Sequence, residues 1–125
     1  MDKRNRPKNL NLFTIRLPIN AVVSILHRAS GMALFVVLPV LLWALNASVQ
    51  SERSYIELSL TMQHWLVKLF LIALSWAFFH HFYAGLRHLA MDVHWMTSLQ
   101  KARFSSRLVF VFVVFTVAIF AVWVW

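Results

Sequence analysis

The chain has no cysteine, only two glycines and only four acidic residues in 125 positions. Without cysteine it forms no disulfide and offers no thiolate to a metal, so the redox state of its compartment cannot be inferred. A bound metal would need His, Met or carboxylate ligands, and the carboxylates are Asp2, Glu52, Glu57 and Asp92. Charged residues make up 13% of the chain, against roughly 25% in soluble domains. These deficits argue against a soluble globular domain.

Hydrophobic residues make up 61% of the chain and gather in three long runs, at 29–45, 65–79 and 108–125. Segments that mix apolar and polar residues extend the first two runs. A membrane-spanning helix needs about 20 mainly apolar residues. We therefore expect an all-α membrane protein with three transmembrane helices, at about 21–46, 64–89 and 105–125. A tail of residues 1–20 precedes this single domain of residues 21–125, and Pro39 is expected to kink the first helix.

The basic residues lie between the apolar runs rather than along one face of a soluble helix. Five of the 12 Lys and Arg residues precede the first span: Lys3, Arg4, Arg6, Lys8 and Arg16. The connecting segment 46–63 is nearly neutral, and the segment after the second run is again basic. Loops of a membrane protein that are rich in Lys and Arg stay on the cytoplasmic side. We therefore expect a cytoplasmic N-terminal tail rather than a secretory signal, a periplasmic C-terminus, and no nucleic-acid partner.

The second apolar run ends in a cluster of ionisable residues, His80, His81, Arg87 and His88, around Gly85. A charged residue at the centre of a spanning helix costs about 2.5–3.5 kcal/mol on insertion scales, and such residues are by default functional. His81, Gly85 and His88 follow i, i+4, i+7 spacing and share one helix face. His81 lies roughly 10 Å from the middle of the span, at about 1.5 Å per residue.

These residue types suit a haem b that is held without a covalent link. A neutral imidazole is a common axial ligand of haem iron, and a glycine one turn away removes side-chain bulk beside a flat macrocycle. Arg87 or His88 would then pair with a haem propionate near water. The alternative is structural, with hydrogen-bonded histidines in a helix bundle and with Arg87 and His88 as anchors to lipid phosphates. We favour this alternative for His80.

The first span opens with a second polar cluster, SILHRASG at residues 24–31. Ser24, Arg28 and Gly31 share one face of a helix, and His27 and Ser30 lie beside it. A hydroxyl and a fixed cation at the membrane boundary suit a quinone, because its carbonyl oxygens accept hydrogen bonds and a nearby Arg stabilises negative charge that develops on them. The alternative is a polar helix entrance in which Arg28 is a cytoplasmic anchor.

Together, the two clusters resemble the cytochrome b membrane-anchor subunit of succinate dehydrogenase. The similarity extends over nearly the whole chain and includes three spans and the polarity of the loops. It rests on SILHRxSG at residues 24–31, on His81-x3-Gly85-x-Arg87-His88-x3-Asp92 one span later, and on the opening Arg6-Pro7-x-Asn9-Leu10 with Ile15-Arg16. Both motifs in this order are far more specific than either one alone.

The resemblance implies a multi-pass subunit of respiratory complex II in the bacterial inner membrane. In that family, two small membrane-anchor subunits hold an iron–sulfur subunit and a flavoprotein subunit, and the flavoprotein carries the dicarboxylate chemistry. Electrons from succinate, an intermediate of the tricarboxylic acid cycle, pass through flavin and iron–sulfur clusters to ubiquinone at the anchor interface. The anchor chain itself is expected to hold no catalytic residue.

The resemblance also implies roles for individual residues. By position, His81 would be one axial ligand of haem b, and the second anchor subunit would supply the other. His27, Arg28, Gly85 and His88 would lie against the haem, and Ser24 and Arg28 would line the ubiquinone site. No role is assigned to His64, His94 or Asp92.

Two alternatives remain open from the residues alone. One is an anchor of fumarate reductase, because the direction of electron flow is not encoded in these side chains. The other is a cofactor-free small transporter or channel subunit in which His and Arg residues relay protons.

Overall fold

The computed structural model describes residues 16–125, and the basic residues before Arg16 and most of the opening motif lie outside this part of the chain. Four helices follow one another: α1 (Ile19–Gln50), α2 (Glu52–Met62), α3 (Trp65–Asp92) and α4 (Leu99–Val124). The described residues contain no strand. Helices α1, α3 and α4 are long and apolar enough to cross a membrane. The expected all-α fold with three candidate spans is thereby confirmed.

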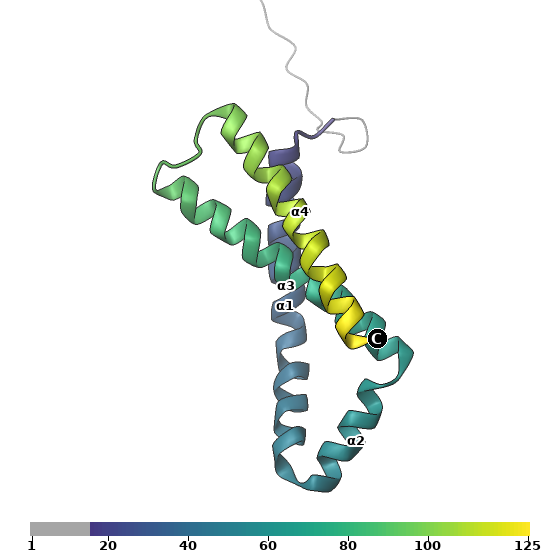
Figure 1. Cartoon of the computed structure of the whole chain (residues 1–125). Helices are drawn as coiled ribbons and strands as arrows, with labels where there is room; N and C mark the ends of the chain where they lie inside the picture. Colours follow the sequence, from purple (N-terminus) through teal and green to yellow (C-terminus); the bar gives the residue numbers. More distant parts are fainter. Residues whose placement is uncertain (1–15) are drawn as a thin grey trace, which may run out of the picture.

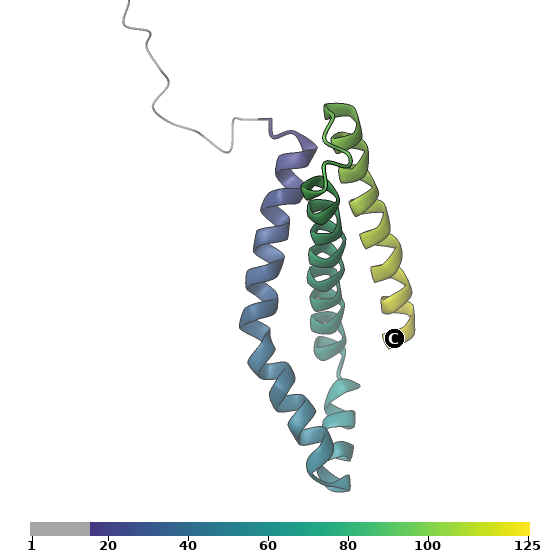
Figure 2. The ribbon, with the colours of Figure 1, turned by 90° about the vertical axis from the view of Figure 1, so that its left-hand side faces the viewer.

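The three long helices run side by side with alternating direction, and α3 lies between α1 and α4 (Figure 2). The start of α1, the end of α3 and the start of α4 therefore lie at one end of the molecule (Figure 1). This arrangement brings residues 24–31 of α1 and residues 80–88 of α3 to the same end. We refer to it below as the basic end, because α4 begins there with exposed Lys101, Arg103 and Arg107.

Helix α1 is continuous through Pro39, which lies within it. Proline has no N–H to bond the carbonyl four residues earlier, here that of Phe35, and its ring crowds that carbonyl. Figure 2 shows α1 changing direction part-way along its length, as the sequence predicted. The bend lies beyond residues 24–31, so it leaves the first turns of α1 straight against α3.

Helix α2 lies in the segment that was expected only to connect two spans. Ser51 and Ser54 form a reciprocal capping box, in which each hydroxyl accepts a hydrogen bond from the other residue's backbone N–H at 3.1 Å. One turn is further stabilised by the ion pair of Arg53 with Glu57, at 2.9 Å, an i, i+4 pair. The helix folds back beside the end of α1 (Figure 1), where the Ser54 hydroxyl donates to the carbonyl of Ala47 at 2.7 Å.

Small side chains allow the three long helices to approach closely at the basic end. Val23, Ala84, Val109 and Val113 form the buried core, and small residues at crossings are typical of packing between membrane helices. The Ser106 hydroxyl of α4 donates to Oδ1 of Asn20 on α1, at 2.9 Å. Most large apolar side chains, by contrast, point outward. The helices are thus joined by small residues and hydrogen bonds, and their bulky residues face lipid or other chains.

We predict that Ala84→Leu destabilises the protein by about 1–3 kcal/mol, the usual cost of forcing extra methylenes into a packed core. Ala84 is fully buried between the helices. Ala73→Leu, on an exposed position of the same helix, is the matched control. The melting temperature of the purified protein measures both changes, and an equal effect of the two substitutions would contradict the tight crossing at Ala84.

Candidate functional site

Three histidines meet where α1 packs against α3 near the basic end. The rings of His27 and His81 stack, with centroids 4.3 Å apart and planes within 12° of parallel. The ring of His88, two turns further along α3, lies 5.1 Å from His27 in a tilted arrangement. The two motifs that are 50 residues apart in the sequence therefore form one cluster. The structure brings together His27, His81, Gly85 and His88.

A backbone carbonyl fixes the orientation of the His81 ring. Nδ1 of His81 lies 3.1 Å from the carbonyl oxygen of His27. Because a carbonyl only accepts hydrogen bonds, Nδ1 carries the proton, and in a neutral ring the lone pair is then on Nε2. Metal-binding histidines usually donate their second nitrogen to a carbonyl or carboxylate in this way. No described residue hydrogen-bonds Nε2 of His81, so its lone pair remains available to a ligand.

Gly31 allows the His81 ring to lie directly against α1. A Cβ atom at this position would stand 2.8 Å from Cε1 of His81 and 3.2 Å from Nδ1, closer than non-bonded atoms pack. At Gly85 a Cβ would be 3.6 Å from Nε2 of His27, an ordinary contact. From the sequence, Gly85 was expected beside the cofactor, whereas Gly31 was only noted to share a helix face with Ser24. The close approach was not predictable, because it depends on how α1 and α3 dock.

His80 makes a second contact between α3 and α1 beside that of His81. Its ring is fully buried, its Nε2 lies 3.4 Å from the carbonyl oxygen of Val23, and it packs between Trp76 and Phe110. Consecutive histidines of α3 thus reach carbonyls one turn apart on α1. This geometry agrees with the bundle role that the sequence favoured for His80.

Ser24 and Arg28 lie one turn apart on α1, at the edge of its contact with α3. Arg28 is exposed and Ser24 half-buried, and the Arg28 guanidinium lies 3.5 Å from the Ser24 hydroxyl, at the outer limit of hydrogen bonding. Their donors therefore point away from the three-helix core. A ligand that arrives from lipid, or at an interface with another chain, reaches them without opening the helix bundle.

Arg87 lies on a different face of α3 from the histidine cluster. It is buried, and its Nε donates to the Ser105 hydroxyl of α4 at 3.1 Å. Of the two candidates that the sequence offered for a propionate partner, only His88 lies beside His27.

The histidine cluster is not arranged as a site for a bare metal ion. Within residues 16–125 there is no group of three or more His or acidic side chains that could hold one. A single oriented imidazole instead suits a metal whose other ligands come from a macrocycle and from a second chain. The donor set and the tautomer of His81 therefore fit an axial ligand of haem.

The sequence matches the profile of a family described as succinate dehydrogenase/fumarate reductase transmembrane subunit, over residues 2–120. The chain belongs to this family. Its two polar motifs, its three candidate spans and the meeting of the motifs in space are thus features of a respiratory membrane subunit. The cofactor-free transporter or channel is no longer a useful alternative.

Similar proteins carry the name succinate dehydrogenase cytochrome b556 subunit. One from Coxiella burnetii is 37% identical over 122 residues, which cover 96% of this chain and 97% of the relative. One from Paracoccus denitrificans is 33% identical, over 86% of this chain and 82% of the relative. A third, from Rickettsia felis, is 32% identical over 81% and 78% of the two chains.

We predict that Gly31→Ala destabilises the protein by about 1–3 kcal/mol, because the new methyl group displaces the His81 ring in a packed interface. The opposite sign is expected of a glycine without such a neighbour, since Gly→Ala in a helix normally stabilises by about 1 kcal/mol. Ala33→Ser, which adds one heavy atom on an exposed position of α1, is the control. A rise in the melting temperature of Gly31→Ala would contradict the close contact.

Proposed function

We propose that the chain is the cytochrome b membrane-anchor subunit of a bacterial succinate:quinone oxidoreductase. It would lie in the inner membrane as a multi-pass protein and form part of the route from succinate to ubiquinone. The observation that carries the proposal is the His27–His81 pair, in which the His27 carbonyl holds Nδ1 of His81 and leaves Nε2 free. Membership in the family and the names of the relatives support the same function.

Residues of α1 and α3 would hold haem b from one side. His81 would ligate the iron through Nε2, and Gly31 leaves room for its ring against α1. Gly85 would lie beside the macrocycle on the face of α3 that also meets the His27 ring. His27, Arg28 and His88, toward the basic end, would be donors for the propionates. Bound there, haem b supplies a one-electron redox centre within the membrane. The second axial ligand would come from a second anchor subunit.

Ser24 and Arg28 would form this chain's part of the ubiquinone site. Arg28 is exposed and Ser24 half-buried at the edge of the helix contact, where a lipid-soluble substrate would have access. The hydroxyl would donate to a quinone carbonyl, and the guanidinium would stabilise the negative charge that develops on oxygen as electrons arrive. The site is completed by other subunits, because one helix face surrounds a quinone on one side only.

The basic end would face the cytoplasm and receive the iron–sulfur subunit, which in turn binds the flavoprotein subunit. Exposed cations gather there at Arg16, Lys101, Arg103 and Arg107, as expected for an inside surface. Succinate oxidation itself would take place on the flavoprotein. Fumarate reduction remains the second candidate reaction, since the family description names both enzymes, but the cited relatives carry the succinate dehydrogenase name.

We predict that His81→Leu abolishes or alters the absorption spectrum of a low-spin haem with two histidine ligands, because it removes the imidazole whose Nε2 would bind the iron. The reduced-minus-oxidised spectrum of the purified complex measures the effect. His94→Asn is the matched control, since His94 lies in the loop before α4 at a positive φ of 61°, which asparagine tolerates. An unchanged spectrum in His81→Leu would exclude this ligand.

We predict that Ser24→Ala and Arg28→Leu each lower the rate of quinone reduction by 10-fold or more, on the order of the loss of one charge-stabilising donor. Succinate oxidation with a soluble artificial acceptor should be retained, because that reaction does not use the membrane site. Ser48→Ala and Arg53→Leu, near the other end of α1 and on α2, are the controls. Loss of both activities would indicate failed assembly rather than a damaged quinone site.

A further inference from the structure

A buried cation lies between α3 and α4, apart from the histidine cluster. Arg87 is 8% exposed, and the only hydrogen bond that the described residues give it runs from Nε to Ser105. The one ion pair in residues 16–125 is that of Arg53 with Glu57, on α2 at the other end of the molecule. The guanidinium charge thus has no carboxylate partner in this part of the chain, although an uncompensated buried charge is costly.

Helix geometry separates this cation from the proposed haem site. At 3.6 residues per turn, Arg87 lies about 120° around α3 from His81. Asp92, the only acid described at this end, lies about 140° around the helix from Arg87. Arg87 therefore faces α4, and its counter-charge must come from that side.

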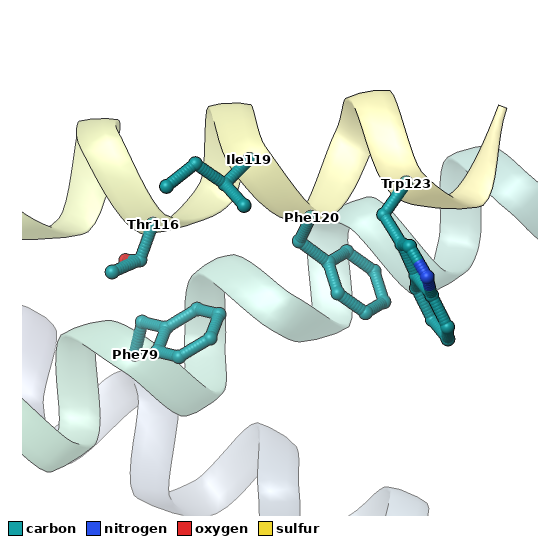
Figure 3. Close-up of a pocket in the computed structure, with 5 residues that line it drawn as sticks. All are labelled: Phe79, Thr116, Ile119, Phe120 and Trp123. Carbon is teal, nitrogen blue, oxygen red and sulfur yellow. The ribbon is translucent and has the colours of Figure 1, made fainter.

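Arg87 stands at the upper end of an apolar groove between α3 and α4. A cavity of about 170 Å³ lies beside it, with walls that include Tyr83, Leu86, Ser105 and Phe112. A second, separate cavity of about 250 Å³ lies further along the same two helices and is lined by Phe79, Thr116, Ile119, Phe120 and Trp123. The two cavities together are called the groove below. Figure 3 shows Phe79 of α3 opposite the four side chains of α4.

The groove has the length of a lipid chain in one leaflet. From Arg87 to Phe79 the distance along α3 is about 12 Å, at 1.5 Å per residue. Half of the membrane's hydrocarbon core is about 15 Å thick. A ligand whose charged group sits at Arg87 would therefore extend its apolar part along this groove toward the middle of the membrane.

A second cation lies above Arg87 on the same side. Lys101 precedes Ser105 by four residues, so the two share a face of α4, and Lys101 is exposed. The neighbouring bases Arg103 and Arg107 lie about 160° around α4 from Ser105. Arg87, which donates to Ser105, and Lys101, one turn before Ser105 on α4, thus give this side of the two helices two basic residues.

We propose that the groove between α3 and α4 is a binding site for an anionic phospholipid of the cytoplasmic leaflet. The phosphate would pair with the terminal NH2 groups of the Arg87 guanidinium, since Nε already donates to Ser105, and would attract Lys101. One acyl chain would lie along Tyr83, Phe112 and Phe79. Basic pockets between membrane helices on the cytoplasmic side bind anionic headgroups in this manner. The proposal is independent of the haem and quinone assignments, because it uses none of their residues.

The test is lipid binding to the detergent-purified, lipid-depleted protein, together with whatever subunits co-purify. Phosphatidylglycerol and phosphatidylcholine with the same acyl chains are titrated separately, and bound lipid is counted by native mass spectrometry. We expect preferential binding of phosphatidylglycerol. Arg87→Gln and Lys101→Gln should each weaken it about fivefold, since one basic residue contributes roughly 1 kcal/mol near an anionic lipid surface. If Arg87→Gln does not fold, the binding of phosphatidylglycerol to Lys101→Gln tests the site.

Arg103→Gln is the matched control, because it removes an exposed cation from the same turns of α4 on the opposite face. Its binding of phosphatidylglycerol should equal that of the unaltered protein. An equal loss in Arg103→Gln and Lys101→Gln would mean a general surface-charge effect and would overturn the site. Equal binding of the two lipids, or displacement by inorganic phosphate alone, would also overturn it, as would a protein chain lying over the groove in the assembled complex.

Discussion

The site depends on one contact, the hydrogen bond from Nδ1 of His81 to the carbonyl of His27. It joins α3 to α1, it selects the tautomer of His81, and it directs the free Nε2 away from its own anchor. A side-chain acceptor in place of the carbonyl would hold the ring less rigidly, because a side chain can change its rotamer. A helix carbonyl is fixed by the backbone, so the ring orientation follows from the packing of the two helices.

That contact requires several other features of the interface. The ring fits only because Gly31 has no side chain beside it, and the helices approach closely only because Val23 and Ala84 are small and buried. His80 makes a parallel contact one turn away on α1. The bend of α1 comes after these residues (Figure 2), so it does not disturb their contacts with α3.

Much of this arrangement was predictable from the sequence, because it follows from periodicity. The three spans, the shared face of His81, Gly85 and His88, and the meeting of the two motifs at one end all follow from helix spacing and alternating direction. Helix α2 was missed, although Ser51 and Ser54 form its cap, since a short polar helix has no apolar run. The partner of Arg87 and the contact at Gly31 depend on how helices dock, which spacing alone does not encode.

Helix α3 shows how one spanning segment keeps two polar groups apart. His81 and His88 lie on the side toward His27 of α1, whereas Arg87, only six residues from His81, lies about 120° away and bonds to α4. Toward α4, Arg87 donates to Ser105, and it needs an anion that the described residues do not supply. Because the two sets of residues point in different directions around α3, one helix carries the proposed haem site and the proposed lipid site on separate faces.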